Sequence, residues 1–267
     1  MGIVKKFKIK SFKKLNTVIQ LDKVSLFYGK RQVLENINLK INQSEIFGVL
    51  GPNGSGKTTI MNLVVGIVRP SSGRILINGE DVTSMPIYER VKRHRMTVIP
   101  QRSGVFWELT CKECLLAIGE LHIPDKKERI QMAETLISKF SLESVENLEC
   151  KLMSGGQVRK TAIAMSLMSK PEIILLDEPF SALDPKSVED LQNTIANLQL
   201  EDSRRAFIIT DHAYRELIQI SDKLGLLADK HFVKQGPVRE VIEDEVSRKV
   251  YFSSSFTNKE RLVRCGV

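Results

Sequence analysis

The sequence lacks most of the features that mark secreted and membrane-spanning chains. It has only four cysteines in 267 residues, too few for a disulfide framework in a chain of this length. Its longest largely apolar run, AIAMSLM at 162–168, has seven residues, whereas a transmembrane helix needs about 20. Residues 1–18 contain no apolar segment of the kind that signal peptides carry. These absences favour a cytoplasmic protein.

Acidic residues are missing from the first 21 positions, and six lysines stand there instead. The whole chain has a formal net charge of +8; six of these charges come from the lysines, and two remain for the rest of the chain. A basic N-terminal extension over 1–17 is suited to contact nucleic acid or an anionic membrane surface. A solvated lysine-rich extension without a partner is an equally good interpretation.

Two kinds of strand are predicted. Residues 17–29, 35–41 and 73–79 alternate apolar and polar side chains, which is typical of half-buried strands. Other runs are short and almost wholly apolar, which suits central strands of a parallel sheet covered on both faces. These runs are 46–50, 173–177, 207–210 and 224–228.

Segments with helical spacing of apolar residues lie between these strands. They are 57–68, 110–121, 125–139, 155–169, 185–200 and 213–220. Alternating strands and helices predict an α/β core. From about 102 to 151 only helical patterns occur, which predicts an all-helical insertion in the sheet domain.

A capping-box pattern, Thr110-x-x-Glu113, opens the first predicted helix of this insertion. It places Cys111 and Cys114 in the first turn of the helix. Their C-x-x-C spacing is also found in zinc and redox sites, but no second pair stands nearby. We therefore interpret both cysteines as structural residues.

The stretch GPNGSGKT at 51–58 fits the phosphate-binding P-loop pattern G-x-x-x-x-G-K-[ST]. It follows a predicted strand and opens a predicted helix, which are the structural conditions for such a loop. Its glycines let backbone N–H groups surround a β-phosphate, while Lys57 suits the β- and γ-phosphate oxygens and Thr58 suits Mg²⁺. The candidate nucleotide-binding residues are Gly51, Pro52, Asn53, Gly54, Ser55, Gly56, Lys57, Thr58 and Thr59.

Two acids, Asp177 and Glu178, stand at the end of the apolar run IILLD. An acid at the end of a central strand beside a P-loop is placed to hold Mg²⁺ through water. Glu178, one residue further on, is a candidate general base toward the attacking water. A helix cap is the alternative interpretation, and the segment FSALDP that follows disfavours it.

A second anion-binding pattern occurs about a hundred residues after the first. In MSGGQVRK, residues 153–160, Ser154 and two glycines open a predicted helix. A helix N-terminus offers backbone N–H groups and the positive end of the helix dipole. The chain therefore contains two candidate phosphate binders but only one complete P-loop.

The motifs GPNGSGKT, IPQ, MSGGQ, IILLDEP, SALD and TDH occur in the order found in ATP-binding cassette (ABC) transporter ATPases, and the chain resembles this family over about 18–236. The resemblance implies an α/β fold of the P-loop NTPase type. It consists of a RecA-like parallel sheet core, an antiparallel β subdomain and an inserted α-helical subdomain at about 102–165. Residues 237–267 then form a C-terminal extension. ATP and Mg²⁺ are the implied cofactors.

The resemblance also implies residue roles. Tyr28 resembles the aromatic residue that stacks on adenine, and Gln101 the glutamine that joins Mg²⁺ to the helical subdomain. The signature loop corresponds to Ser154, Gly155, Gly156 and Gln157, the dimer-contacting aspartate to Asp184, and the histidine that contacts the γ-phosphate to His212. Two copies pack head to tail in this family. The implied state is a homodimer with each ATP between one P-loop and the other copy's signature loop.

The family further implies separate transmembrane permease subunits as partners, bound near the glutamine loop. In QRSGVFWELT, residues 101–110, Phe106 and Trp107 are candidates for this contact. Burial in the core is the alternative for Phe106. The implied location is the cytoplasmic face of the inner membrane, reached through these partners, and no nucleic acid is expected.

The cargo is indicated by two further segments. ITDHAYRE at 209–216 and the tail at 236–256 resemble the lipopolysaccharide-export ATPases. In the first segment Asp211 precedes the histidine, whereas many family members have the opposite order. The implied function is an ATPase that powers lipopolysaccharide export. A branched-chain amino-acid importer ATPase and a cassette protein acting on nucleic acid or ribosomes are the alternatives.

Overall fold

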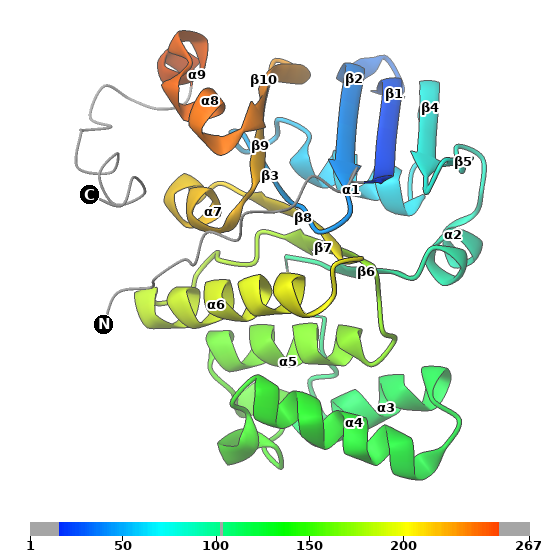
Figure 1. Cartoon of the computed structure of the whole chain (residues 1–267), viewed down its shortest axis with the longest axis vertical. Helices are drawn as coiled ribbons and strands as arrows, with labels where there is room; N and C mark the ends of the chain where they lie inside the picture. Colours follow the sequence, from blue (N-terminus) through cyan, green and yellow to red (C-terminus); the bar gives the residue numbers. More distant parts are fainter. Residues whose placement is uncertain (1–15, 102–103, 251–267) are drawn as a thin grey trace.

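The computed structural model describes residues 16–101 and 104–250 (Figure 1). The predicted basic extension up to residue 15 and the predicted export-type tail from residue 251 lie outside the described residues. In the described ranges, every helix is too short or too polar to cross a bilayer. Two sheets and their helices enclose two apolar cores.

The larger sheet has six strands in the order β10-β9-β3-β8-β7-β6. Their bounds are Ile46–Leu50 (β3), Met96–Ile99 (β6), Ile173–Asp177 (β7), Ala206–Asp211 (β8), Lys223–Ala228 (β9) and His231–Pro237 (β10). The neighbours from β9 to β6 pair in parallel, and β10 joins the edge antiparallel. Alternate residues of β7 enter the two different cores, so both faces of the sheet are covered. The predicted α/β core is confirmed.

Two strands of this sheet, β6 and β10, are absent from the sequence prediction. β6 has only four residues, and two of them are half-buried. β10 contains Gly236 and Pro237 and is largely exposed or half-buried. Both lie at the edges of the sheet, where side chains pack on fewer neighbours, so neither strand shows the apolar run that marks a central strand.

The smaller sheet is antiparallel, in the order β2-β1-β4-β5. Its strands are Thr17–Tyr28 (β1), Arg31–Asn42 (β2), Ser72–Ile77 (β4) and Glu80–Asp81 (β5). As the alternation predicts, every second side chain along much of these strands is buried in the core, for example Ile37, Leu39 and Ile41. The buried face packs on helix α1 (Lys57–Val65) and one face of the larger sheet. The implied antiparallel subdomain is therefore present.

Six helices agree with the predicted positions. They are α1, α3 (Cys111–His122), α4 (Lys126–Lys139), α5 (Gly155–Leu167), α6 (Pro185–Glu201) and α7 (Tyr214–Ile220). α1 ends three residues before its predicted end, because Gly66 forms a left-handed C-cap with φ 94°. The prediction misses short elements: α2 (Ile87–Arg93), α8 (Val238–Glu243), α9 (Glu245–Val250) and 3-10 turns at Glu143–Val145 and Cys150–Leu152. None exceeds seven residues, which is too short to show a 3.6-residue period.

Helices α3, α4 and α5 gather below the larger sheet in Figure 1. The described residues between 104 and 155 form helices and turns, with an isolated bridge between Thr110 and Glu149. This agrees with an inserted helical subdomain. Its bounds, 102–165, and the other domain limits remain predictions.

The predicted capping box is confirmed. The Thr110 hydroxyl accepts a hydrogen bond from the Glu113 N–H at 3.2 Å, and the Glu113 carboxylate accepts one from the Thr110 N–H at 2.9 Å. Cys111 and Cys114 are buried behind it, and burial raises the pKa of both thiols. Buried thiols of raised pKa pack as small apolar groups and react poorly.

Thr110→Ala is expected to lower the free energy of unfolding by about 1 kcal/mol, because α3 loses its N-cap. Thr135→Ala is the matched control, since Thr135 is exposed in the middle of α4 and alanine favours helix. Urea unfolding of the two variants gives both values. Equal stability of Thr110→Ala and the wild type would show that the capping box contributes nothing.

Candidate functional site

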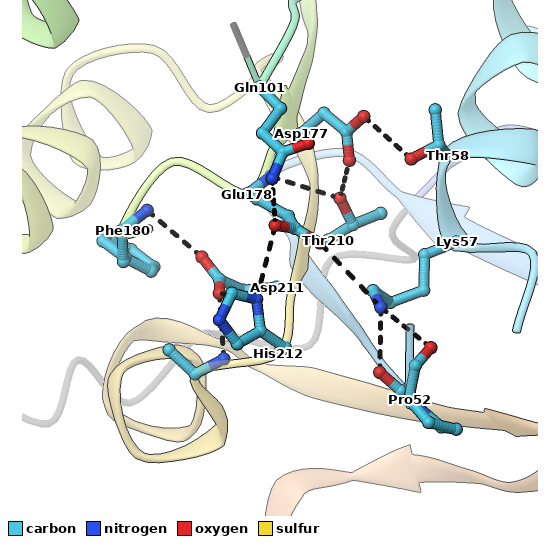
Figure 2. Close-up of polar contacts among 12 residues, drawn as sticks. Pro52, Lys57, Thr58, Gln101, Asp177, Glu178, Phe180, Thr210, Asp211 and His212 are labelled. Carbon is cyan, nitrogen blue, oxygen red and sulfur yellow. Dashed lines mark hydrogen bonds and ion pairs between the residues drawn. The ribbon is translucent and has the colours of Figure 1, made fainter. Parts of the chain in front are cut away.

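The P-loop segment lies between β3 and α1 and depends on glycine. A Cβ atom on Gly51 would lie 2.3 Å from the Leu227 carbonyl oxygen, and Gly54 and Gly56 have φ values of 78° and 107°. The Lys57 side chain is buried and folds back over this turn. Its Nζ donates to the carbonyl oxygens of Gly51 at 2.8 Å and Pro52 at 3.2 Å (Figure 2).

Two features of the loop fit an anionic ligand. The buried Ser55 hydroxyl has no hydrogen-bond partner among the described residues, and an unpaired buried hydroxyl is costly. Burial lowers the pKa of Lys57, while Glu178, Asp177 and Asp211 act to raise it. The loop therefore offers an unsatisfied hydroxyl and a cation whose partners in the loop are neutral carbonyls.

Asp177 ends β7 and is held by two hydroxyl groups. Thr58 Oγ1 donates to Oδ2 at 2.9 Å, and Thr210 Oγ1 donates to Oδ1 at 2.5 Å. The structure thus brings together Thr58 and Asp177, the two predicted magnesium ligands from the P-loop and from β7 (Figure 2). Hydroxyl and carboxylate oxygens are the donors that Mg²⁺ prefers, so the residues present fit this ion.

Glu178 lies at the centre of the cluster. Gln101 Nε2 donates to Glu178 Oε2 at 2.6 Å, and His212 Nδ1 lies 3.3 Å from the same oxygen. Lys57 Nζ lies 4.0 Å from the other oxygen, Oε1. Glu178 also has φ 45°, a left-handed conformation that is costly for a residue with a Cβ. Strained residues of this kind concentrate at functional sites.

Asp211 connects the loop after Glu178 to the loop that contains His212. Its buried carboxylate accepts from the Phe180 N–H at 3.1 Å and from the Ala213 N–H at 2.9 Å. Burial raises the pKa of the Asp211 carboxyl, although the two N–H groups lower it. His212 Nδ1 lies 3.6 Å from Asp211 Oδ1. Asp211 therefore has a structural role at the site, between the two loops.

The second anion-binding segment begins α5. Ser154 is the N-cap and forms a capping box with Gln157, and a Cβ on Gly156 would lie 2.6 Å from Ser187 Oγ. Asp184 is the N-cap of α6 and accepts from the Lys186 and Ser187 N–H groups. The starts of α5 and α6 are thus in contact.

The polar cluster of Figure 2 contains neither the signature residues nor Tyr28. Tyr28 ends β1 with 49% of its surface exposed, which leaves the ring open to a ligand. The structure of one chain therefore unites the P-loop, Gln101, the two acids and His212. Tyr28, Ser154–Gln157 and Asp184 lie outside this network of contacts.

Sequence reasoning missed two residues of this site. Arg159 on α5 donates to the carbonyl oxygens of Pro100 at 2.8 Å and Gln101 at 2.7 Å, which ties the signature helix to the glutamine loop. Thr210 contacts Asp177 directly. Thr210 stands immediately before the Asp211-His212 pair, and this position in the sequence could have indicated that it belongs to the site. Nothing in the sequence pattern distinguishes Arg159 from a surface arginine.

The comparisons with known proteins agree with this geometry. The family model described as ABC transporter matches residues 34–181, more than half of the chain. The chain belongs to the ABC transporter family. This ATP-hydrolysing family fits the P-loop and the acids described above, and the chain is an ATP-hydrolysing subunit of a transporter of this kind.

Two curated relatives are lipopolysaccharide export system ATP-binding proteins named LptB. The Haemophilus influenzae protein is 33% identical over 241 residues, which cover 90% of this chain and 99% of the relative. The Escherichia coli protein is 35% identical over 232 residues, which cover 86% and 94%. Both alignments extend over nearly the whole of each relative.

Solved structures show the same fold. A nucleotide-free ATP-binding cassette from an ABC transporter has a TM-score of 0.79 at 22% identity and covers 89% of this chain and 99% of its own. The cassette MJ0796, solved as a dimer in a post-hydrolysis state bound to ADP and Pi, has a TM-score of 0.74 at 26% identity, with 83% and 99% covered. The predicted P-loop NTPase fold is confirmed.

Glu178→Gln is expected to reduce ATP hydrolysis by about 10²–10⁴-fold, because an amide cannot take a proton from water. ATP binding should persist, since the P-loop is unchanged. Phosphate release and binding of a fluorescent ATP analogue measure the two effects. Glu134→Gln, at an exposed site on α4, is the control and should hydrolyse ATP normally. Near-normal hydrolysis by Glu178→Gln would contradict its role as base.

Proposed function

We propose that the chain is the ATPase subunit of a transporter that exports lipopolysaccharide and that it works on the cytoplasmic face of the inner membrane. The observation that carries this proposal is the 33–35% identity to the two LptB proteins over 86–90% of the chain. The order Asp211-His212 and the tail from 236 support the same assignment. The relatives reported above do not favour an amino-acid importer or a protein that acts on nucleic acid.

In the proposed nucleotide site, Gly51–Thr59 surround the phosphates, and the exposed ring of Tyr28 stacks on adenine. Lys57 exchanges its carbonyl partners for phosphate oxygens. Thr58, Asp177 and Gln101 would hold Mg²⁺, for which their oxygen atoms are suited. When bound, Mg²⁺ neutralises charge on the β- and γ-phosphate oxygens.

Glu178 acts as the general base in this proposal. Its carboxylate takes a proton from the attacking water, and Gln101 and His212 hold the same oxygen from two sides. The left-handed backbone at Glu178 turns the chain sharply after β7, so that consecutive acids serve metal binding and proton transfer. His212 is also assigned to the γ-phosphate.

The second anion loop is proposed to bind the ATP of another copy. Ser154, Gly155, Gly156 and Gln157 stand at the positive end of the 13-residue helix α5 and belong to no contact of Figure 2. A head-to-tail homodimer brings this loop and Asp184 to the partner's P-loop, and two-fold symmetry makes both sites equal. The dimeric state of the MJ0796 cassette supports this arrangement.

Phe106 and Trp107 are proposed to contact the transmembrane permease subunits. Each has 45% of its surface exposed, whereas the preceding Val105 is buried. This exposure argues against the alternative that Phe106 packs in the core. Exposed aromatic residues anchor protein interfaces, and here they lie between Gln101 and the start of α3.

Reconstitution tests the proposed function. The subunit is purified from membranes with its permeases and placed in proteoliposomes, where ATP should drive extraction of lipopolysaccharide and no uptake of branched-chain amino acids.

Phe106→Ala should weaken permease pull-down by about 2 kcal/mol while thermal unfolding stays unchanged. Leu200→Ala, an exposed apolar residue at the end of α6, is the control. For the function as a whole, amino-acid uptake by the proteoliposomes, or RNA co-purified in place of permeases, would reject the proposed lipopolysaccharide export.

The action of the signature loop in trans is tested by mixing chains that carry Lys57→Ala with chains that carry Ser154→Arg. In a head-to-tail dimer, one site then has both lesions and the other has neither, so hydrolysis should partly recover on mixing. The trapped mixed dimer should hold ATP in the intact site only. One lesion in each site, shown by ATP occupancy, would contradict the head-to-tail arrangement.

A further inference from the structure

Thr210 is buried with no exposed surface, at a position that the proposed mechanism does not use. In the parallel ladder of β7 and β8, Thr210 stands directly opposite Asp177. Its hydroxyl donates to Asp177 Oδ1 at 2.5 Å. Its carbonyl oxygen accepts from the Glu178 N–H at 2.8 Å, so the same residue contacts both acids.

We propose that Thr210 is a positioning residue that fixes the Asp177 carboxylate for magnesium binding. This inference rests on the proposed assignment of Asp177 to Mg²⁺. The two hydroxyls on Asp177 come from different elements: Thr58 from α1 bonds Oδ2, and Thr210 from β8 bonds Oδ1. Thr58 is itself a proposed magnesium ligand, so its hydroxyl would serve both the ion and Asp177. Thr210 has no assigned role toward the ion or the nucleotide, so its contact serves to orient Asp177.

The short hydrogen bond of the Thr210 hydroxyl is the one to Asp177. Its further hydrogen-bond contacts in the described part of the chain are long: the Glu178 N–H at 3.4 Å and the Met61 sulfur at 3.9 Å. Packing alone would be served by valine, which has the same shape and suits a buried strand. A valine would leave Asp177 Oδ1 without this donor, and the carboxylate would be held by Thr58 on Oδ2 alone among the contacts of the described residues.

The experiment compares Thr210→Val with the wild type at fixed ATP over a range of Mg²⁺ concentrations. The Mg²⁺ concentration for half-maximal hydrolysis should rise about 10–100-fold, which is typical when the partner of a metal ligand is removed. Binding of Mn²⁺ to the ATP complex, followed by electron paramagnetic resonance, should weaken by the same factor. Binding of ATP in excess EDTA should stay at the wild-type value.

Two variants separate the hydroxyl from the volume of the side chain. Thr210→Ser restores the donor and should restore wild-type Mg²⁺ dependence. Thr161→Val makes the same chemical change at another fully buried threonine, whose hydroxyl contacts the Cys111 and Met153 sulfurs. It should leave Mg²⁺ dependence unchanged. If Thr210→Val does not fold, Thr210→Ala replaces it with the same expectation.

Mg²⁺ and Mn²⁺ dependence within twofold of the wild type in a folded Thr210→Val variant would overturn the inference. So would a Thr210→Ser variant as impaired as the valine variant. Asp177→Asn distinguishes this failure from failure of the proposed site. Normal Mg²⁺ binding by Asp177→Asn would reject the assignment of Asp177 itself, whereas weak binding by Asp177→Asn with normal Thr210→Val would reject only the role of Thr210.

Discussion

The parallel register of β3, β8 and β7 is the constraint on which the rest of the site depends. In this ladder Leu50 stands opposite Asp211, and Asp177 stands opposite Thr210. The three strands therefore end at the same edge, where the P-loop, Glu178 and His212 follow directly. Main-chain hydrogen bonds of the ladder thus fix where the site side chains start. A slip of one residue in β7 would turn the side chain of Asp177 to the other face of the sheet.

Apart from the Ser55 hydroxyl, the site side chains at this edge form hydrogen bonds within the described structure. Lys57 is bonded to two carbonyls, Thr58 to Asp177 and Gln101 to Glu178. Buried polar groups are costly when unpaired, so these contacts stabilise the site in the structure of the chain alone. In the proposed mechanism, ATP and its metal ion exchange such contacts for stronger, charge-assisted ones. The left-handed backbone at Glu178 is held by two hydrogen bonds: the Glu178 N–H donates to the Thr210 carbonyl, and the Phe180 N–H donates to the Asp211 carboxylate.

Helix α5 connects the signature loop, the start of α6 and the loop that contains Gln101. Its first turn holds the signature loop and touches the start of α6 through Gly156 and Ser187. In its second turn, Arg159 binds the carbonyls of Pro100 and Gln101. One rigid helix thus joins the loop proposed to bind the partner's ATP to the residue proposed to contact Mg²⁺. The same helix packs on α3, which follows the exposed Phe106 and Trp107 in the chain.

The sequence by itself determined the central strands, the long helices, the capping box and the family, because each depends on local periodicity or on a motif whose chemistry requires fixed residue types. The sequence did not predict edge strands such as β6 or helices as short as α2. Edge strands bury fewer side chains, and short helices contain too few turns to show a periodic pattern. Only the tertiary structure decided that Thr210 contacts Asp177 and that Arg159 donates hydrogen bonds to the carbonyls of Pro100 and Gln101. These pairs are far apart along the chain, and they meet only because the parallel register and the packing of α5 bring the segments together.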